Sequence, residues 1–135
     1  MALEIPDAWR SGRNSRVLAH LETASAHSDL ATELIAAVKP LGDVQIFCPD
    51  WAQCRYVVVS TNDLIFGFAM GLETIAFRLE ARMKSRALTT GAAAYSAAGD
   101  DWGSFILFRH DWPKVDLQFW ALKAYAYARE HRVGG

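Results

Sequence analysis

Apolar residues along positions 14–39 recur at steps of three and four, the spacing of residues on one face of a helix. The residues of this stripe are Val17, Leu21, Ala24, Ser28, Ala31, Ile35 and Val38. The pattern predicts a long N-terminal helix with Asn14 as its N-cap and Pro40 at its end. Leu30 lies off the stripe, which favours either a break near residues 28–29 or a contact from a second side.

Between Asp43 and Leu79 the period of the pattern changes to two, which is typical of strands. Four strands are predicted, at Val44–Cys48, Arg55–Thr61, Leu64–Ala69 and Glu73–Leu79. Their connections are short, and Asn62 with Asp63 has the composition of a tight turn. Short connections join antiparallel neighbours, so we expect these strands to form a meander.

The remainder of the chain predicts two helices around one more strand. A short helix is expected over Glu80–Leu88, followed by small, glycine-rich residues at 91–103. The strand Ser104–Arg109 comes next, because its apolar run fits a buried position in a sheet. A C-terminal helix is expected from about Pro113 to His131. Its candidate N-caps are Asp111 and Asp116, and its apolar face carries Leu117, Trp120, Ala121, Ala124 and Ala128.

Together these elements predict a single α+β domain over residues 1–135, with a long N-terminal helix, a short helix and a C-terminal helix packed on an antiparallel sheet of about five strands. Residues 1–12 are expected to form an irregular lead-in, and residues 132–135 a flexible tail. Three strands are apolar on both faces, so both sides of the sheet need cover. Helices cover one face. The lead-in, the glycine-rich segment or a second copy of the chain covers the other, so a homodimer is one prediction.

Four segments follow one another in a recognisable order: Ile75–Leu79, Glu80–Leu88, Asp101–Phe105 and Ala124–Tyr127. In this order the chain resembles the MmcQ/YjbR-like proteins and the related luciferase-like domains of bacteria, over roughly residues 43–128. The resemblance implies a frataxin-like α+β sandwich, and it implies DNA binding only as a suggestion made for such domains from their fold. The chain departs from the group in its long N-terminal helix and in Arg78, where those domains often have lysine.

Composition limits the function without identifying it. The 135 residues are 52% hydrophobic and 21% charged, which excludes a disordered chain and fits one domain. The net charge of −1 removes the strongest argument for nucleic-acid binding, a large basic surplus. The first residues lack the features of a signal peptide, and no apolar run is long enough for a membrane span. We therefore expect a cytoplasmic protein without membrane contact.

Aromatic residues around the strand at 104–109 give the best candidate for a ligand site. Trp102 and Trp112 flank this strand in loop-like sequence, and Tyr95 lies in the segment before it. Small-molecule pockets are commonly lined by aromatic side chains with a few polar groups. The alternative is that these rings fill the core.

A basic set that follows the fourth strand gives the second candidate site. It consists of Arg78, Arg82, Lys84 and Arg86, of which Arg82 and Arg86 share a helix face because they are four apart. Such a set can hold a phosphate, a nucleic acid or an acidic partner. Equally, it can be a solvated surface that Glu80 partly neutralises.

An acid–histidine group gives the third candidate, which is catalytic. His110 and Asp111 can act as an acid–base pair only if the chain turns after the strand, because neighbours on a strand point to opposite faces. Asp111 has a simpler role as a helix cap. Asp100 and Asp101 have a simpler role in a solvated loop.

Cysteine and histidine spacing gives no metal site and one open question. Cys48 and Cys54 flank a predicted hairpin loop, where their β-carbons approach the spacing of a disulfide. We interpret them as half-buried thiols, with a redox-sensitive pair as the alternative. His20 and His27 lie two turns apart on one predicted helix, too far for one metal ion. Since no cofactor motif is present, no cofactor or metal is predicted.

The sequence therefore favours a non-catalytic ligand-binding or protein-interaction module that uses the Trp102 region. A nucleic-acid-binding module based on the basic set is the alternative. A small hydrolase-like enzyme at His110 and Asp111 is the second alternative.

Overall fold

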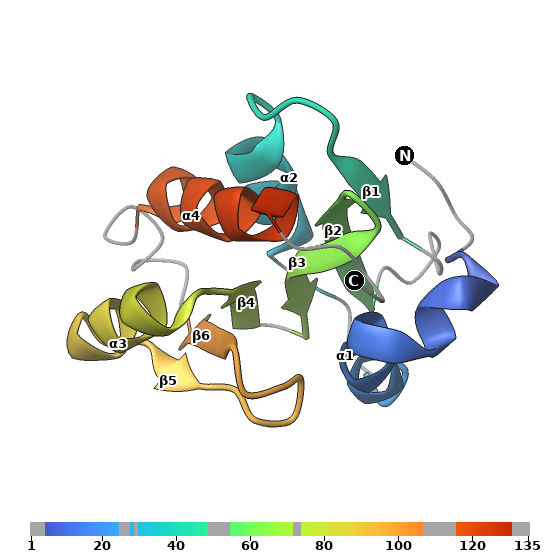
Figure 1. Ribbon diagram of the computed structural model, residues 1–135, viewed down its shortest axis with the longest axis horizontal. Coiled ribbons are helices and arrows are strands. Elements are labelled where there is room, and N and C mark those ends of the chain that lie inside the picture. The colour runs from blue at the N-terminus through green and yellow to red at the C-terminus, as the bar shows by residue number, and fades with distance from the viewer. Residues whose placement is uncertain are drawn as a thin grey trace.

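The computed structural model describes residues 5–24, 28, 30–48, 55–71, 74–106 and 116–130 (Figure 1). Their elements are two 3-10 helices, η1 (Asp7–Arg10) and η2 (Gly12–Asn14), four α-helices, α1 (Ser15–Leu21), α2 (Ala31–Val38), α3 (Ala81–Thr89) and α4 (Leu117–Glu130), and six strands, β1 (Gln45–Phe47), β2 (Tyr56–Thr61), β3 (Leu64–Met70), β4 (Thr74–Arg78), β5 (Ala93–Ala94) and β6 (Trp102–Ile106). The protein has the predicted α+β class.

The described strands form one antiparallel sheet in the order β1-β2-β3-β4-β6-β5. The predicted four-strand meander is confirmed by the pairing of β1 through β4. The sheet has six strands rather than about five, because Ala93 and Ala94 pair with Ser104 and Gly103. The predicted strand at 104–109 begins earlier, at Trp102, and its positions 107–109 lie outside the described residues.

The prediction of one long helix over 14–39 is wrong. The chain forms α1 and α2 instead, and α1 ends at Leu21, where the backbone turns through Glu22 and Thr23. Figure 1 shows α2 and α4 on one side of the sheet and α1 on the other. A sheet that is apolar on both faces is stabilised by burying both. The need to cover both faces outweighs the tendency of the continuous apolar stripe to form one helix. The off-stripe Leu30 marks the start of α2, where it is fully buried.

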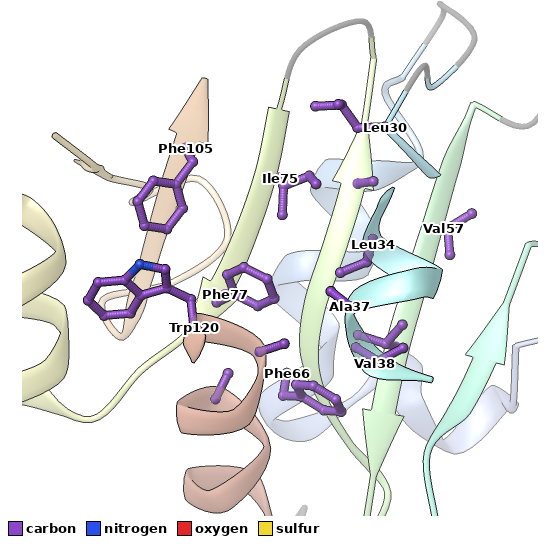
Figure 2. Close-up of a cluster of buried hydrophobic side chains, with 14 of the residues drawn as sticks. Leu30, Leu34, Ala37, Val38, Val57, Phe66, Ile75, Phe77, Phe105 and Trp120 are labelled. Carbon is purple, nitrogen blue, oxygen red and sulfur yellow. The ribbon is translucent and has the colours of Figure 1, made fainter. Parts of the chain in front are cut away.

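Alternate residues of β2 and β3 enter two separate cores. Val57 and its partner Ala69 belong to the core under α2 and α4, whereas Val58 and its partner Phe68 belong to the core under α1. Figure 2 shows the first of these cores, in which the Trp120 ring of α4 lies near Phe105 of β6. Their ring centres are 5.6 Å apart. The α4 face predicted from the sequence is confirmed, with Trp120, Ala121, Ala124 and Ala128 buried and Leu117 partly buried.

The chain itself covers the second face of the sheet. Trp9 of η1 packs edge-on against Phe47, with ring centres 5.0 Å apart. Ala98, from the glycine-rich segment, joins α1 in the same core. The predicted lead-in is therefore ordered into η1 and η2 over the described residues. The homodimer was expected because a second copy of the chain was one way to cover this face. Since the chain covers the face itself, the homodimer remains a prediction without that support.

Asn14 fixes η2 to the hairpin between β2 and β3. Its side chain donates to the carbonyl of Asp63 at 2.9 Å and accepts from the backbone N–H of Ile65 at 2.9 Å. Asn14 stands at the N-cap position of α1 but makes no side-chain cap hydrogen bond, so the predicted capping role is wrong. The hairpin turn is confirmed, and Asn62 and Asp63 both adopt positive φ, which these residues tolerate better than most.

Side-chain caps lie at the start of α3 and of α4. The Glu80 carboxylate accepts from the N–H of Arg82 at 3.0 Å at the start of α3. The Asp116 carboxylate accepts from the N–H of Phe119 at 3.0 Å at the start of α4, as one of the two predicted caps. Residues 111–115 lie outside the described part. None of the described helices is both long enough and apolar enough to cross a lipid bilayer.

Candidate functional site

A cavity of about 730 Å³ lies where η2 and α1, the end of β4, α3 and the end of α4 meet. Its walls also include residues 98–101 of the glycine-rich segment. The polar and charged side chains on its walls include Arg13, Arg16, Arg78, Lys84, Asp101 and Tyr127. We call it the Arg78 cavity, after the most buried of these side chains.

Arg78 is the last residue of β4, and its side chain is only 3% exposed. Strand alternation places it on the face opposite Phe77, toward the core under α1. Its guanidinium donates from Nε to the Ile65 carbonyl at 2.8 Å and from Nη2 to the Arg13 carbonyl at 3.1 Å. The guanidinium also lies over the Trp102 ring, 5.0 Å from its centre. Burial lowers the pKa of Arg78, and the nearby Asp101 carboxylate opposes this shift.

Asp101 balances part of this positive charge. Its Oδ2 accepts from Nη1 of Arg78 at 3.3 Å and from Nη2 of Arg13 at 3.1 Å. Its backbone carbonyl accepts from the N–H of Leu79 at 2.7 Å, which fixes the segment to the end of β4. The interpretation of Asp101 as a solvated loop residue is therefore wrong, because two arginines hold its carboxylate at the cavity wall.

Three further polar side chains on the wall, those of Tyr127, Arg16 and Lys84, contact other parts of the chain. Arg13 lies within 3.5 Å of the Tyr127 hydroxyl, which joins η2 to α4. Arg16 donates to the Ser96 carbonyl, and the Lys84 ammonium donates to the Asp100 carbonyl. The cations thus come from three regions of the chain, and each is attached to the backbone or to a side chain of another region. This attachment orients the cations toward one space.

The structure divides the predicted basic set. Arg78 and Lys84 line the cavity, whereas Arg82 is exposed on α3 and does not. Arg86 is directed toward α4, with its guanidinium 5.3 Å from the centre of the Phe119 ring. The four residues therefore do not form one surface.

The predicted aromatic site is also divided. Trp102 is fully buried in the core under α1, with its ring centre 5.1 Å from that of Phe68. Tyr95 is half-buried and its hydroxyl lies 2.6 Å from Nε2 of His20. Neither lines the Arg78 cavity. Trp102 is a core residue, and Trp112 lies outside the described residues.

The pair Tyr95 and His20 is a half-buried polar contact that the sequence did not indicate. Burial raises the pKa of Tyr95 and lowers the pKa of His20. Both shifts favour the neutral forms of the two side chains, which share one hydrogen bond between the Tyr95 hydroxyl and Nε2 of His20. The contact attaches α1 to the segment that follows β5.

Several predicted residues lie outside the described part of the chain, namely His27, Cys54, His110, Asp111 and Trp112. The predicted acid–base pair and the predicted cysteine pair are therefore not described, although Cys48 is buried. Across the ranges that the structure describes, no three His, Cys, Asp or Glu side chains gather closely enough to hold a metal ion.

Sequence reasoning missed Arg13, Arg16 and Tyr127 as parts of a site. Arg13 and Asp101 are 88 positions apart, so no local pattern relates them. One signal was present: Arg78 ends an apolar strand, and a charge placed there needs a partner. No family model, no curated protein and no solved structure matches the chain, so its resemblance to MmcQ/YjbR-like domains stays a prediction.

Proposed function

We propose that the protein is a non-catalytic ligand-binding domain that takes a small organic anion in the Arg78 cavity. One observation carries the proposal: four cationic side chains from three regions of the chain surround a single cavity of about 730 Å³. That size lies within the range of small-molecule sites, about 300–1,000 Å³. The ligand region differs from the one predicted around Trp102 and Trp112, while the class of function is the same.

The placement of Arg78 adds to the support for this proposal. A buried guanidinium loses its hydration, which is costly unless acceptors replace the water. Asp101, one nearby carboxylate, is shared between Arg78 and Arg13. Two guanidinium groups that share one carboxylate oxygen are a favourable environment for a further anion.

Nucleic-acid binding is the weaker proposal. It needs an exposed basic surface, because phosphate contacts along a strand come from accessible Lys and Arg side chains. Arg78 is buried and Lys84 lines the cavity. Arg82 and Arg86 are both exposed, but the guanidinium of Arg86 lies over the Phe119 ring, which leaves Arg82 without a described ring or cavity contact. The DNA binding implied by the family resemblance stays a suggestion on the same ground.

A thermal-shift experiment tests the proposed function. Benzoate, phthalate, phenyl phosphate and inorganic phosphate would be compared with the neutral compounds phenol and benzamide at constant ionic strength. A ligand that binds only the folded state raises its melting temperature. We expect at least one organic anion to raise it and the neutral compounds to have no effect.

Two matched variants show whether the effect comes from this cavity. Arg13→Gln removes a cation from the wall, and Arg82→Gln removes one from the exposed face of α3. The shift should be lost in Arg13→Gln and kept in Arg82→Gln. Equal shifts in both variants, or no shift with any anion in the unmodified chain, would contradict the proposal.

A further inference from the structure

We infer that the ligand of the Arg78 cavity is a monoester of phosphoric acid whose organic group is apolar. The inference rests on the proposed anion-binding function and adds the chemical class of the anion. Three properties of the cavity wall support it: its surplus charge, its number of donors and its apolar side.

The charged residues of the wall leave a surplus of two positive charges. Arg13, Arg16, Arg78 and Lys84 carry four positive charges, and Asp100 and Asp101 carry two negative charges. A monocarboxylate would leave one positive charge uncompensated. A phosphate monoester carries nearly two negative charges above its second pKa, which is about 6. The phosphate group therefore matches the wall more closely.

The wall also offers more donors than a planar carboxylate can use. A guanidinium has five N–H donors. Within the described residues Arg78 commits three of them, to Ile65, Arg13 and Asp101. The guanidinium of Arg16 and the ammonium of Lys84 each donate to one described carbonyl, so they have further donors for a ligand. Three phosphate oxygens accept from several directions at once, which suits donors that come from α1, β4 and α3.

Apolar residues also line the cavity, and we call them its apolar side. They are Leu79, Ala81, Leu88 and Ala98, and Leu88 is one of the two large hydrophobic side chains that are exposed in the described structure, at 40%. Leu79 and Ala98 are already buried, whereas Ala81 and Leu88 are exposed and would stay in contact with water beside inorganic phosphate. An apolar ester group would cover them and gain the free energy of that burial.

Isothermal titration calorimetry of the full chain at about pH 8 tests the inference with three probes: phenyl phosphate, benzoate and inorganic phosphate. We expect phenyl phosphate to bind at least about tenfold more tightly than either of the others. Benzoate binding as tightly as phenyl phosphate would overturn the phosphate part of the inference. Inorganic phosphate binding as tightly would overturn the apolar part. Either result leaves the proposed anion-binding function standing, whereas no binding of any probe would contradict both.

A pair of leucine variants localises the apolar side. Leu88→Ser changes an exposed leucine of the cavity, and Leu122→Ser changes an exposed leucine that does not line it. Both substitutions are at the surface, so the fold should tolerate them. Leu88→Ser should weaken phenyl phosphate severalfold and leave inorganic phosphate unchanged, and Leu122→Ser should change neither. Equal weakening of both probes by Leu88→Ser would overturn the assignment of the ester group to this side.

Discussion

Arg13 and Arg78 donate to the same oxygen atom, Oδ2 of Asp101, at 3.1 Å and 3.3 Å. The two residues come from η2 and the end of β4, which the Asp101 carboxylate thereby joins. Asp101 also lines the cavity in which we propose that the anion binds, so its carboxylate is a structural partner and, under that proposal, a competitor of the ligand.

Asp101→Asn should therefore strengthen anion binding while it destabilises the fold. The neutral amide competes less for the two guanidinium groups, so the Kd for phenyl phosphate should fall severalfold. The free energy of unfolding should fall by about 1–3 kcal/mol, because a buried arginine loses its charged partner. Calorimetry and urea denaturation measure the two effects.

Asp100→Asn is the matched control for Asp101→Asn. It removes the same charge from an exposed neighbour whose backbone carbonyl, not its carboxylate, is the described acceptor of Lys84. Its effects on affinity and stability should be small. If both variants strengthened binding equally, the total charge of the wall rather than the position of Asp101 would be responsible.

Arg78→Lys should destabilise the protein despite keeping the charge. An ammonium group is a single point of donation and lacks the planar fork that reaches Ile65, Arg13 and Asp101 together. Buried acceptors would lose their partners, at a cost of about 2–4 kcal/mol in urea denaturation. Arg82→Lys on the exposed face of α3 should stay within about 0.5 kcal/mol. If Arg78→Lys also changed the free energy of unfolding by no more than about 0.5 kcal/mol, the contacts of Arg78 would contribute little to stability.

The centre of the sheet should not tolerate a side chain at Gly67. A β-carbon there would lie 3.0 Å from Cγ2 of Val59 and 3.1 Å from Cδ1 of Phe77, both on paired strands. Gly67→Ala should therefore reduce stability by about 1–3 kcal/mol. Gly42→Ala meets nothing within 4 Å and should be neutral or slightly stabilising in the same thermal or urea unfolding experiment. Equal effects of the two substitutions would contradict this account of the sheet.

Stability should decrease as the pH falls because of His20. Its pKa in the folded state is lowered by burial, so the folded protein favours the neutral ring more than the unfolded chain does. The His20 contribution is fully present above the unfolded pKa of about 6.5 and is lost as the pH falls through the lower folded value. Urea denaturation between pH 8 and pH 5 should show this decrease.

His20→Gln should reduce the part of the pH dependence that comes from this residue. Tyr95→Phe should weaken the fold at pH 8, since it removes the hydroxyl that lies 2.6 Å from Nε2 of His20. An unchanged slope in His20→Gln would assign the pH dependence to other titrating groups.

The sequence predicted the sheet better than the helices around it. Strand alternation is local, and Val57 with Val58 illustrates it, since successive residues enter opposite cores. The stripe from Val17 to Val38 misled because helical periodicity is the same whichever face of a sheet the helix covers. The off-stripe Leu30 was the local sign of a break, which the sequence allowed near residues 28–29 and which begins earlier, after Leu21.

The candidate site was predictable only in part. Arg78 and Lys84 were identified because basic residues close in sequence are visible as a set. Arg13 and Tyr127 were not, because their contacts join residues far apart in the chain. Trp102 was placed near a pocket, but the loop-like sequence around it does not show that β6 begins at this residue and buries the ring.

The division of the N-terminal region between the two faces has a consequence for protein engineering. The segment that precedes α2 supplies the cover of one sheet face through Val17, Leu18 and Leu21, and it also supplies Arg13 and Arg16 to the cavity. A shortened chain that starts at β1 would expose a broad apolar surface of the sheet. It would also lack two of the four cations of the cavity. Such an exposed surface favours aggregation. Truncation from this end should therefore yield insoluble protein rather than a minimal binding domain.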